Sequence, residues 1–110
     1  MKKCELDIDQ ATIARIKKQM AKGEIDENTL KVLSLRKEYL EKVGFEKFLE
    51  TKSLNAQYEE KNKEGSFLIE RNTKEKRTVR CIFKVKTEDK KIVLALKVIE
   101  IDTNFYKEED

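Results

Sequence analysis

The chain has 110 residues, of which 43% are charged and 38% are hydrophobic, and its 25 basic and 22 acidic residues give a formal net charge of +3. This length suits one domain with a single small core, and charge of mixed sign is typical of a salt-bridged surface rather than a disordered polyelectrolyte. No apolar run approaches the ~20 residues of a membrane span and no signal peptide precedes the first polar residues, so we expect a cytoplasmic protein with no membrane partner.

The N-terminal residues have the pattern of a short strand followed by a helix. Residues 3–8 alternate between polar and apolar side chains, which predicts a strand with one buried face. Asp9 is a typical helix N-cap, and Gly23 stands where a helix ends with a left-handed residue. A first helix is therefore expected at about 10–22.

A second, longer helix is expected from Asp26 to Val43, because apolar residues recur there at three-to-four spacing. Gly44 ends or bends it, and one or two further helical turns follow. Residues 51–65 are polar and predict a connection, with one exposed helical turn at about 56–61.

After Gly65 the hydrophobic period changes to that of strands. Residues 66–71 and 77–86 alternate, with Ile82 the one exception in the second run. Residues 92–101 are nearly all apolar, which predicts a central strand covered on both faces. We therefore predict one α+β domain, 1–110, in which an N-terminal strand and two to three helices pack on an antiparallel meander sheet of three to four strands. Its parts are a helical half at about 9–50, the polar connection 51–65, a sheet half 66–102 and a frayed acidic tail 103–110.

Positive charge collects in the predicted sheet. Between Glu70 and Lys97 there are ten basic and four acidic residues, whereas the last eleven residues carry five acids and one lysine. Alternation places Arg80, Lys84 and Lys86 on one strand face, about 6.6–7 Å apart at each two-residue step, a spacing that suits the phosphates of a nucleic acid. The predicted nucleic-acid-binding residues are Arg71, Lys84, Lys86 and Lys97. A merely solvated sheet face is the alternative.

Three segments of this half together resemble a known family. They are Arg77-Thr-Val-Arg80-Cys-Ile-Phe-Lys-Val, then Lys91-Ile-Val-Leu-Ala-Leu-Lys-Val, then Asp102-Thr-Asn-Phe-Tyr106. This pattern resembles the C-terminal sheet of the RelE/HigB family, small toxins of toxin–antitoxin pairs that cut messenger RNA, usually on the ribosome. The order of one strand, two helices and a strand meander is also similar. The resemblance implies RNA or the ribosome, and a cognate protein, as partners.

The resemblance implies attack of a ribose 2′-hydroxyl on the adjacent phosphate, which needs a base, an acid and cations. The chain has no histidine, so Glu70 is the available carboxylate base, with a crowded lysine as the other option. Arg71, Arg77 and Arg80 would stabilise the transition state, and Tyr106 matches the family's C-terminal tyrosine. Glu70 and Tyr106 each also have a purely structural alternative. Glu70 would form a cross-strand salt bridge, and Tyr106 would be a hydrophobic plug where the last strand ends.

A second function fits the same sequence. The two predicted helices form a hairpin that can present a surface to a protein partner, as a phage-encoded inhibitor or adaptor of a larger complex would. Whether the protein is an enzyme is left open by the residues. Cys4 and Cys81 alternate with apolar neighbours and should be buried and inert. No metal site and no cofactor are predicted.

Overall fold

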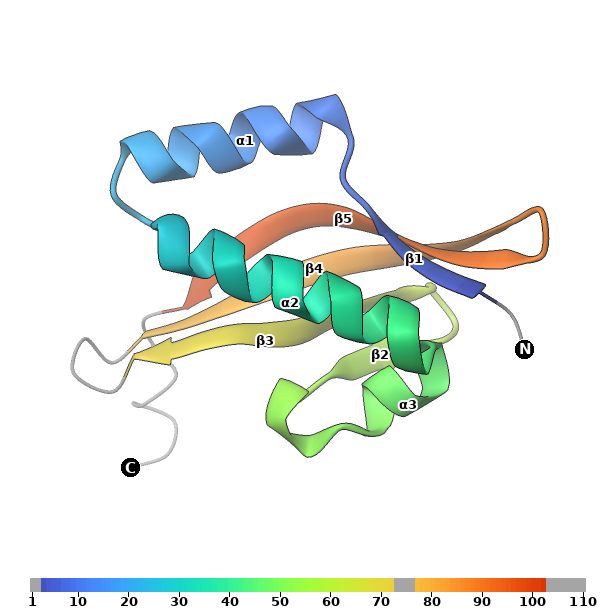
Figure 1. Ribbon diagram of the computed structural model, residues 1–110. Helices are drawn as coiled ribbons and strands as arrows, with labels where there is room; N and C mark the ends of the chain where they lie inside the picture. The colour runs from blue at the N-terminus through green and yellow to red at the C-terminus, as the bar shows by residue number, and fades with distance from the viewer. Residues whose placement is uncertain (1–2, 73–76, 103–110) are drawn as a thin grey trace.

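The computed structural model describes residues 3–72 and 77–102 (Figure 1). Within them, three α-helices and a five-stranded mixed sheet confirm the predicted α+β class. The elements in chain order are β1 (Lys3–Asp7), α1 (Gln10–Ala21), α2 (Glu27–Val43), α3 (Phe45–Glu50), the short 3-10 helix η1 (Lys52–Leu54), β2 (Gln57–Glu59), β3 (Glu64–Asn72), β4 (Arg77–Glu88) and β5 (Lys91–Asp102).

Local side-chain caps set the starts of the two long helices. The Asp9 side chain accepts a hydrogen bond from the Thr12 amide at 2.8 Å, so α1 begins at the next residue. Asp26 and Thr29 form a reciprocal capping box at the start of α2. Gly44, with φ +86°, ends α2 in a conformation that favours glycine. These predicted boundaries are confirmed.

The sheet order is β1-β5-β4-β3-β2, with β1 parallel to β5 and the other pairs antiparallel. The predicted antiparallel meander is present as β3-β4-β5, but the sheet has five strands rather than three to four, because β2 and the parallel β1 add to its two sides. Between β1 and β5 the chain passes through the helices and the meander, and this long excursion lets the two strands run in the same direction. The Asp89-Lys90 turn joins β4 and β5, and both residues have positive φ, as a type I′ two-residue hairpin requires.

The polar connection contains more structure than predicted. It holds η1 and β2, and the predicted helical turn at 56–61 is wrong because this segment instead supplies the edge strand beside β3. Gly65 on β3 makes that edge possible: a Cβ there would overlap the Gln57 carbonyl oxygen and lie 2.7 Å from Phe83 Cζ. The Tyr58 and Phe83 rings stack over this position, with centroids 6.4 Å apart.

The core lies between the helices and one face of the sheet. Phe48, Phe67 and Phe83 are fully buried there, and the predicted inward alternation of β4 is confirmed at Val79 and Cys81. β5 lies between β1 and β4, so its central position is confirmed. The expectation that both of its faces are covered is wrong, because the described helices pack on one side only (Figure 1).

α1 protects the part of β5 that β1 does not reach. β1 pairs with β5 only as far as Asp7 opposite Ala95. Beyond that point the Thr12 hydroxyl donates to the Leu96 carbonyl at 3.1 Å and the Gln19 amide to the Ile99 carbonyl at 2.8 Å. These bonds occupy acceptors on an open strand edge. They also hold α1 along β5, so that it diverges from α2 (Figure 1).

None of the helices among residues 3–72 and 77–102 is long and apolar enough to cross a membrane. The predicted acidic tail, 103–110, lies outside the described residues.

Candidate functional site

Glu70 and Arg77 lie on the helix-covered side of the sheet. A register shift between Leu68 and Glu70 places Glu70 opposite Val79, and the Thr29 hydroxyl of α2 lies 3.3 Å from a Glu70 carboxylate oxygen. Arg77 approaches the same end of α2. The pKa of Asp26 is lowered, first by the hydrogen bond from the Thr29 amide and more weakly by the charge of Arg77. These two predicted catalytic residues therefore gather around the start of α2.

Arg80 lies on the other side of the sheet. Its Nε and Nη2 donate to the Ser66 hydroxyl at 3.1 and 3.0 Å, and Nη2 also donates to the Asn55 carbonyl at 2.6 Å. Desolvation is the largest effect on the pKa of the Arg80 guanidinium and lowers it, whereas the negative charge of Glu100 raises it. Arg80 thus ties the segment after η1 to the sheet, and Glu70 stands on the opposite face.

We call the sheet face opposite the helices the open face. Its members among the described residues include Leu68, Arg71, Arg80, Ile82, Lys84, Lys86, Val93, Ala95 and Val98. Lys84 and Lys86 are exposed there, as the alternation predicted, and Arg71 is exposed near Arg80. Lys97 stands apart in a bulge of β5, close enough to Asp9 to help lower the pKa of that carboxyl after the Thr12 hydrogen bonds. Tyr106 lies outside the described residues.

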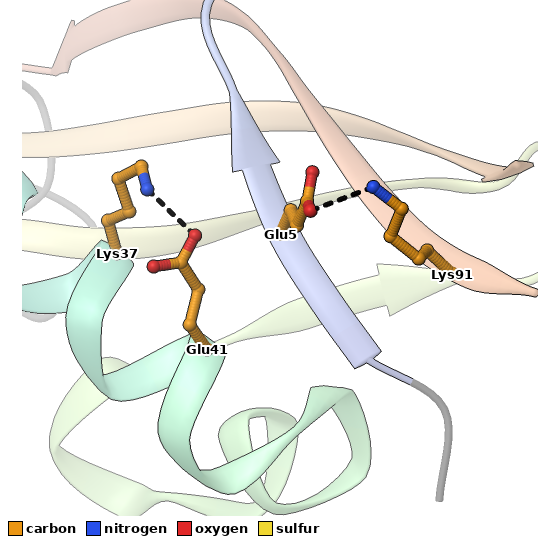
Figure 2. Close-up of polar contacts among 4 residues, drawn as sticks. All are labelled: Glu5, Lys37, Glu41 and Lys91. Atoms are coloured by element: carbon orange, nitrogen blue, oxygen red, sulfur yellow. Dashed lines mark hydrogen bonds and ion pairs between the residues drawn. The ribbon is translucent and has the colours of Figure 1, made fainter. Parts of the chain in front are cut away.

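Acidic residues interleave with the basic ones on the open face. Lys86 Nζ lies 3.2 Å from a carboxylate oxygen of Glu88. Lys91 Nζ lies 3.0 Å from a carboxylate oxygen of Glu5 (Figure 2). Lys84 stands opposite Glu64 in the register, as Arg80 stands opposite Glu100. Opposite charges on paired strands stabilise a sheet. The positive excess read from one stretch of sequence is therefore balanced locally, by Glu88 on β4 itself and by Glu5, Glu64 and Glu100 from other strands.

The centre of the open face is apolar. Leu68, Ile82, Ala95 and Val98 are half-buried, and Val93 is only 4% exposed although it lies outside the main core cluster. The signals in the sequence were the exceptional Ile82 and the nearly continuous apolar run of β5. The open face is thus a mixed surface of paired charges around an apolar strip.

An apolar groove lies between α1 and α2. We call it the α1–α2 groove, and its volume is about 370 Å³. Its lining comes from β1, α1, α2 and the link between β1 and α1: Leu6, Ile8, Ile13, Ile16, Lys17, Met20, Leu30, Leu33, Ser34 and Lys37. Buried side chains include Leu6, Ile16 and Leu33, whereas Ile13 and Met20 remain half-exposed. Ile13, Ile16 and Met20 recur at helical spacing in the sequence, but this spacing does not show that α1 leaves part of the stripe uncovered.

The described residues offer little reactive chemistry. Among residues 3–72 and 77–102, no group of three or more potential metal ligands is assembled. Burial raises the pKa of the Cys4 thiol to about 12 and that of Cys81 well above its usual value, so both are protonated thiols in the folded protein.

No protein-family model, no curated protein sequence and no solved structure matches this chain.

Proposed function

We propose that this chain is a non-enzymatic binding protein that takes a helical segment of a protein partner into the α1–α2 groove. The observation that carries this proposal is the groove itself, a hollow of about 370 Å³ whose lining is apolar except for two lysines and one serine. Grooves walled by two helices are a recurrent docking site for an amphipathic helix.

Apolar surface of the groove that remains in contact with water is unfavourable in free energy, and a bound partner would cover it. Ile13 lines the groove and is only partly buried, so part of its apolar side chain remains in contact with water. Burying apolar surface stabilises by about 25 cal/mol per Å², and contiguous exposed apolar patches commonly mark interaction sites. A partner helix laid along α1 would cover Ile13 and Met20 together.

The positions of the predicted catalytic residues favour binding over catalysis. A base must reach the reacting hydroxyl within hydrogen-bonding distance while cations contact the same phosphate. Glu70 contacts Thr29 under the helices, whereas Arg80 contacts Ser66 and Asn55 on the open face. One phosphate cannot touch both sides of a sheet at once. Glu70 and Arg80 therefore cannot serve one phosphate together as its base and its cation.

Affinity capture with matched variants tests the proposal. Ile13→Asp places a charge in the groove, and Leu35→Asp places one on the outer side of α2, where Leu35 is 59% exposed. We expect protein partners that wild type and Leu35→Asp retain and that Ile13→Asp loses, with all three proteins folded by circular dichroism. The same captured proteins with Ile13→Asp would refute the groove. Captured RNA, together with new transcript ends on expression that vanish with Arg80→Ala, would replace the proposal by the nuclease function.

A further inference from the structure

The charged residues that line the α1–α2 groove are both basic. Its two charged lining residues are Lys17 of α1 and Lys37 of α2, and they stand on opposite walls. The whole of α1 contains three basic residues and no acid. We infer that the partner helix is amphipathic and acidic, with carboxylates flanking its apolar stripe so that each wall lysine meets one. This inference rests on the proposed function and names the chemistry of its partner.

The dimensions of the groove set the length of the partner segment. α1 has 12 residues, which at about 1.5 Å per residue makes a wall roughly 18 Å long. A helix laid along it would contact the groove over about three turns, with apolar side chains at positions i, i+3 or i+4, and i+7. Acidic residues one position outside this stripe would lie above Lys17 and Lys37.

Lys37 already has a partner that a bound carboxylate must replace. Its Nζ lies 2.7 Å from the Glu41 carboxylate one turn along α2 (Figure 2), and the two side chains are 44% and 36% exposed. Exposed pairs of this kind contribute little stability and are screened by salt. An incoming acid therefore competes at small cost, and Lys37 remains usable as a docking cation.

Two designed peptides separate this inference from the proposed function. Both are fluorescein-labelled helical peptides of about 15 residues with leucine at i, i+3 and i+7; one carries glutamate on both flanks of the stripe and the other lysine. In fluorescence polarisation at low salt, we expect the acidic peptide to bind about tenfold more tightly than the basic one. The two wall lysines attract the glutamates of the acidic peptide and repel the lysines of the basic one. Lys17→Glu and Lys37→Glu should each reduce this preference about threefold, and the double variant should abolish or invert it.

The outcomes are distinguishable. Equal affinity for the two peptides, with both lost in Ile13→Asp, overturns the acidic partner and leaves the groove as a protein-binding site. A preference that persists in the double lysine variant also overturns it, because the charge recognised would lie elsewhere. Binding of neither peptide overturns both the inference and the proposed function.

Discussion

Arg80→Ala separates a structural arginine from a catalytic one. The substitution removes two bonds to the Ser66 hydroxyl and one to the Asn55 carbonyl, at 3.1, 3.0 and 2.6 Å. Hydrogen bonds from charged groups contribute about 1.5–3 kcal/mol each, and partial exposure of this set reduces the sum. We expect a loss of about 2 kcal/mol, which for a domain of this size lowers Tm by roughly 8 °C.

Thermal unfolding followed by circular dichroism measures this loss. Lys84→Ala is the matched control, since Lys84 is an exposed base on the same strand and face, and its Tm should change little. Ser66→Ala should be non-additive with Arg80→Ala, because the two side chains share the bonds. An Arg80→Ala protein with the Tm of wild type would refute the structural role. If that protein also lost RNA cleavage on expression, the catalytic assignment would be correct.

Three further outcomes are expected. Gly65→Ala should lower Tm by at least as much as Arg80→Ala, because the added Cβ meets backbone and an aromatic ring. Gly23→Ala has open space around it and should cost only the strain of φ +75°. Equal losses of Tm in Gly65→Ala and Gly23→Ala would contradict this expectation. The pKa of the Asp9 carboxyl is lowered in the folded protein, chiefly by the hydrogen bond from the backbone amide that it caps. The ionised carboxylate therefore stabilises the fold above the unfolded carboxyl pKa of about 4, and this stabilisation is lost as the pH falls through the lower pKa of the folded protein. Tm measured from about pH 6 down to about pH 2 should therefore fall less steeply in Asp9→Asn, a comparable cap that does not titrate; an unchanged slope would show that other groups dominate. Cys4 and Cys81 should resist a thiol reagent in the native protein and react after unfolding in denaturant, because burial raises both pKa values; a thiol that reacts at once in the native state would count against their burial.

Features that depend on near neighbours in the chain were predictable. A cap such as Asp9 or Asp26 acts on amides three residues away, and the inward alternation of β4 follows from the period of a strand. The protected thiols follow from the same alternation. For these features the residues that decide the outcome are adjacent in sequence, so no tertiary information was needed.

The candidate catalytic residues show where such reasoning stops. Strict alternation from Phe67 and Ile69 puts Glu70 on the open face, beside Arg80. The bulge between Leu68 and Glu70 reverses that assignment and turns Glu70 toward Thr29. A one-residue shift moves a side chain to the other face of a sheet, and the pattern of hydrophobic residues around Ile69 does not announce it.

The sequence by itself determined the α+β class, the starts of α1 and α2 and the inward face of β4, because each depends on contacts within a few residues. Only the tertiary structure decided that β1 runs parallel to β5, that acids from other strands balance the bases of the open face, and that α1 leans on β5 rather than on α2. The α1–α2 groove follows from that last choice. Two hydrogen bonds, from Thr12 and Gln19 to carbonyls about 80 residues away, hold α1 against β5. Contacts between residues so far apart in sequence produce no periodic pattern of side chains from which they could be predicted.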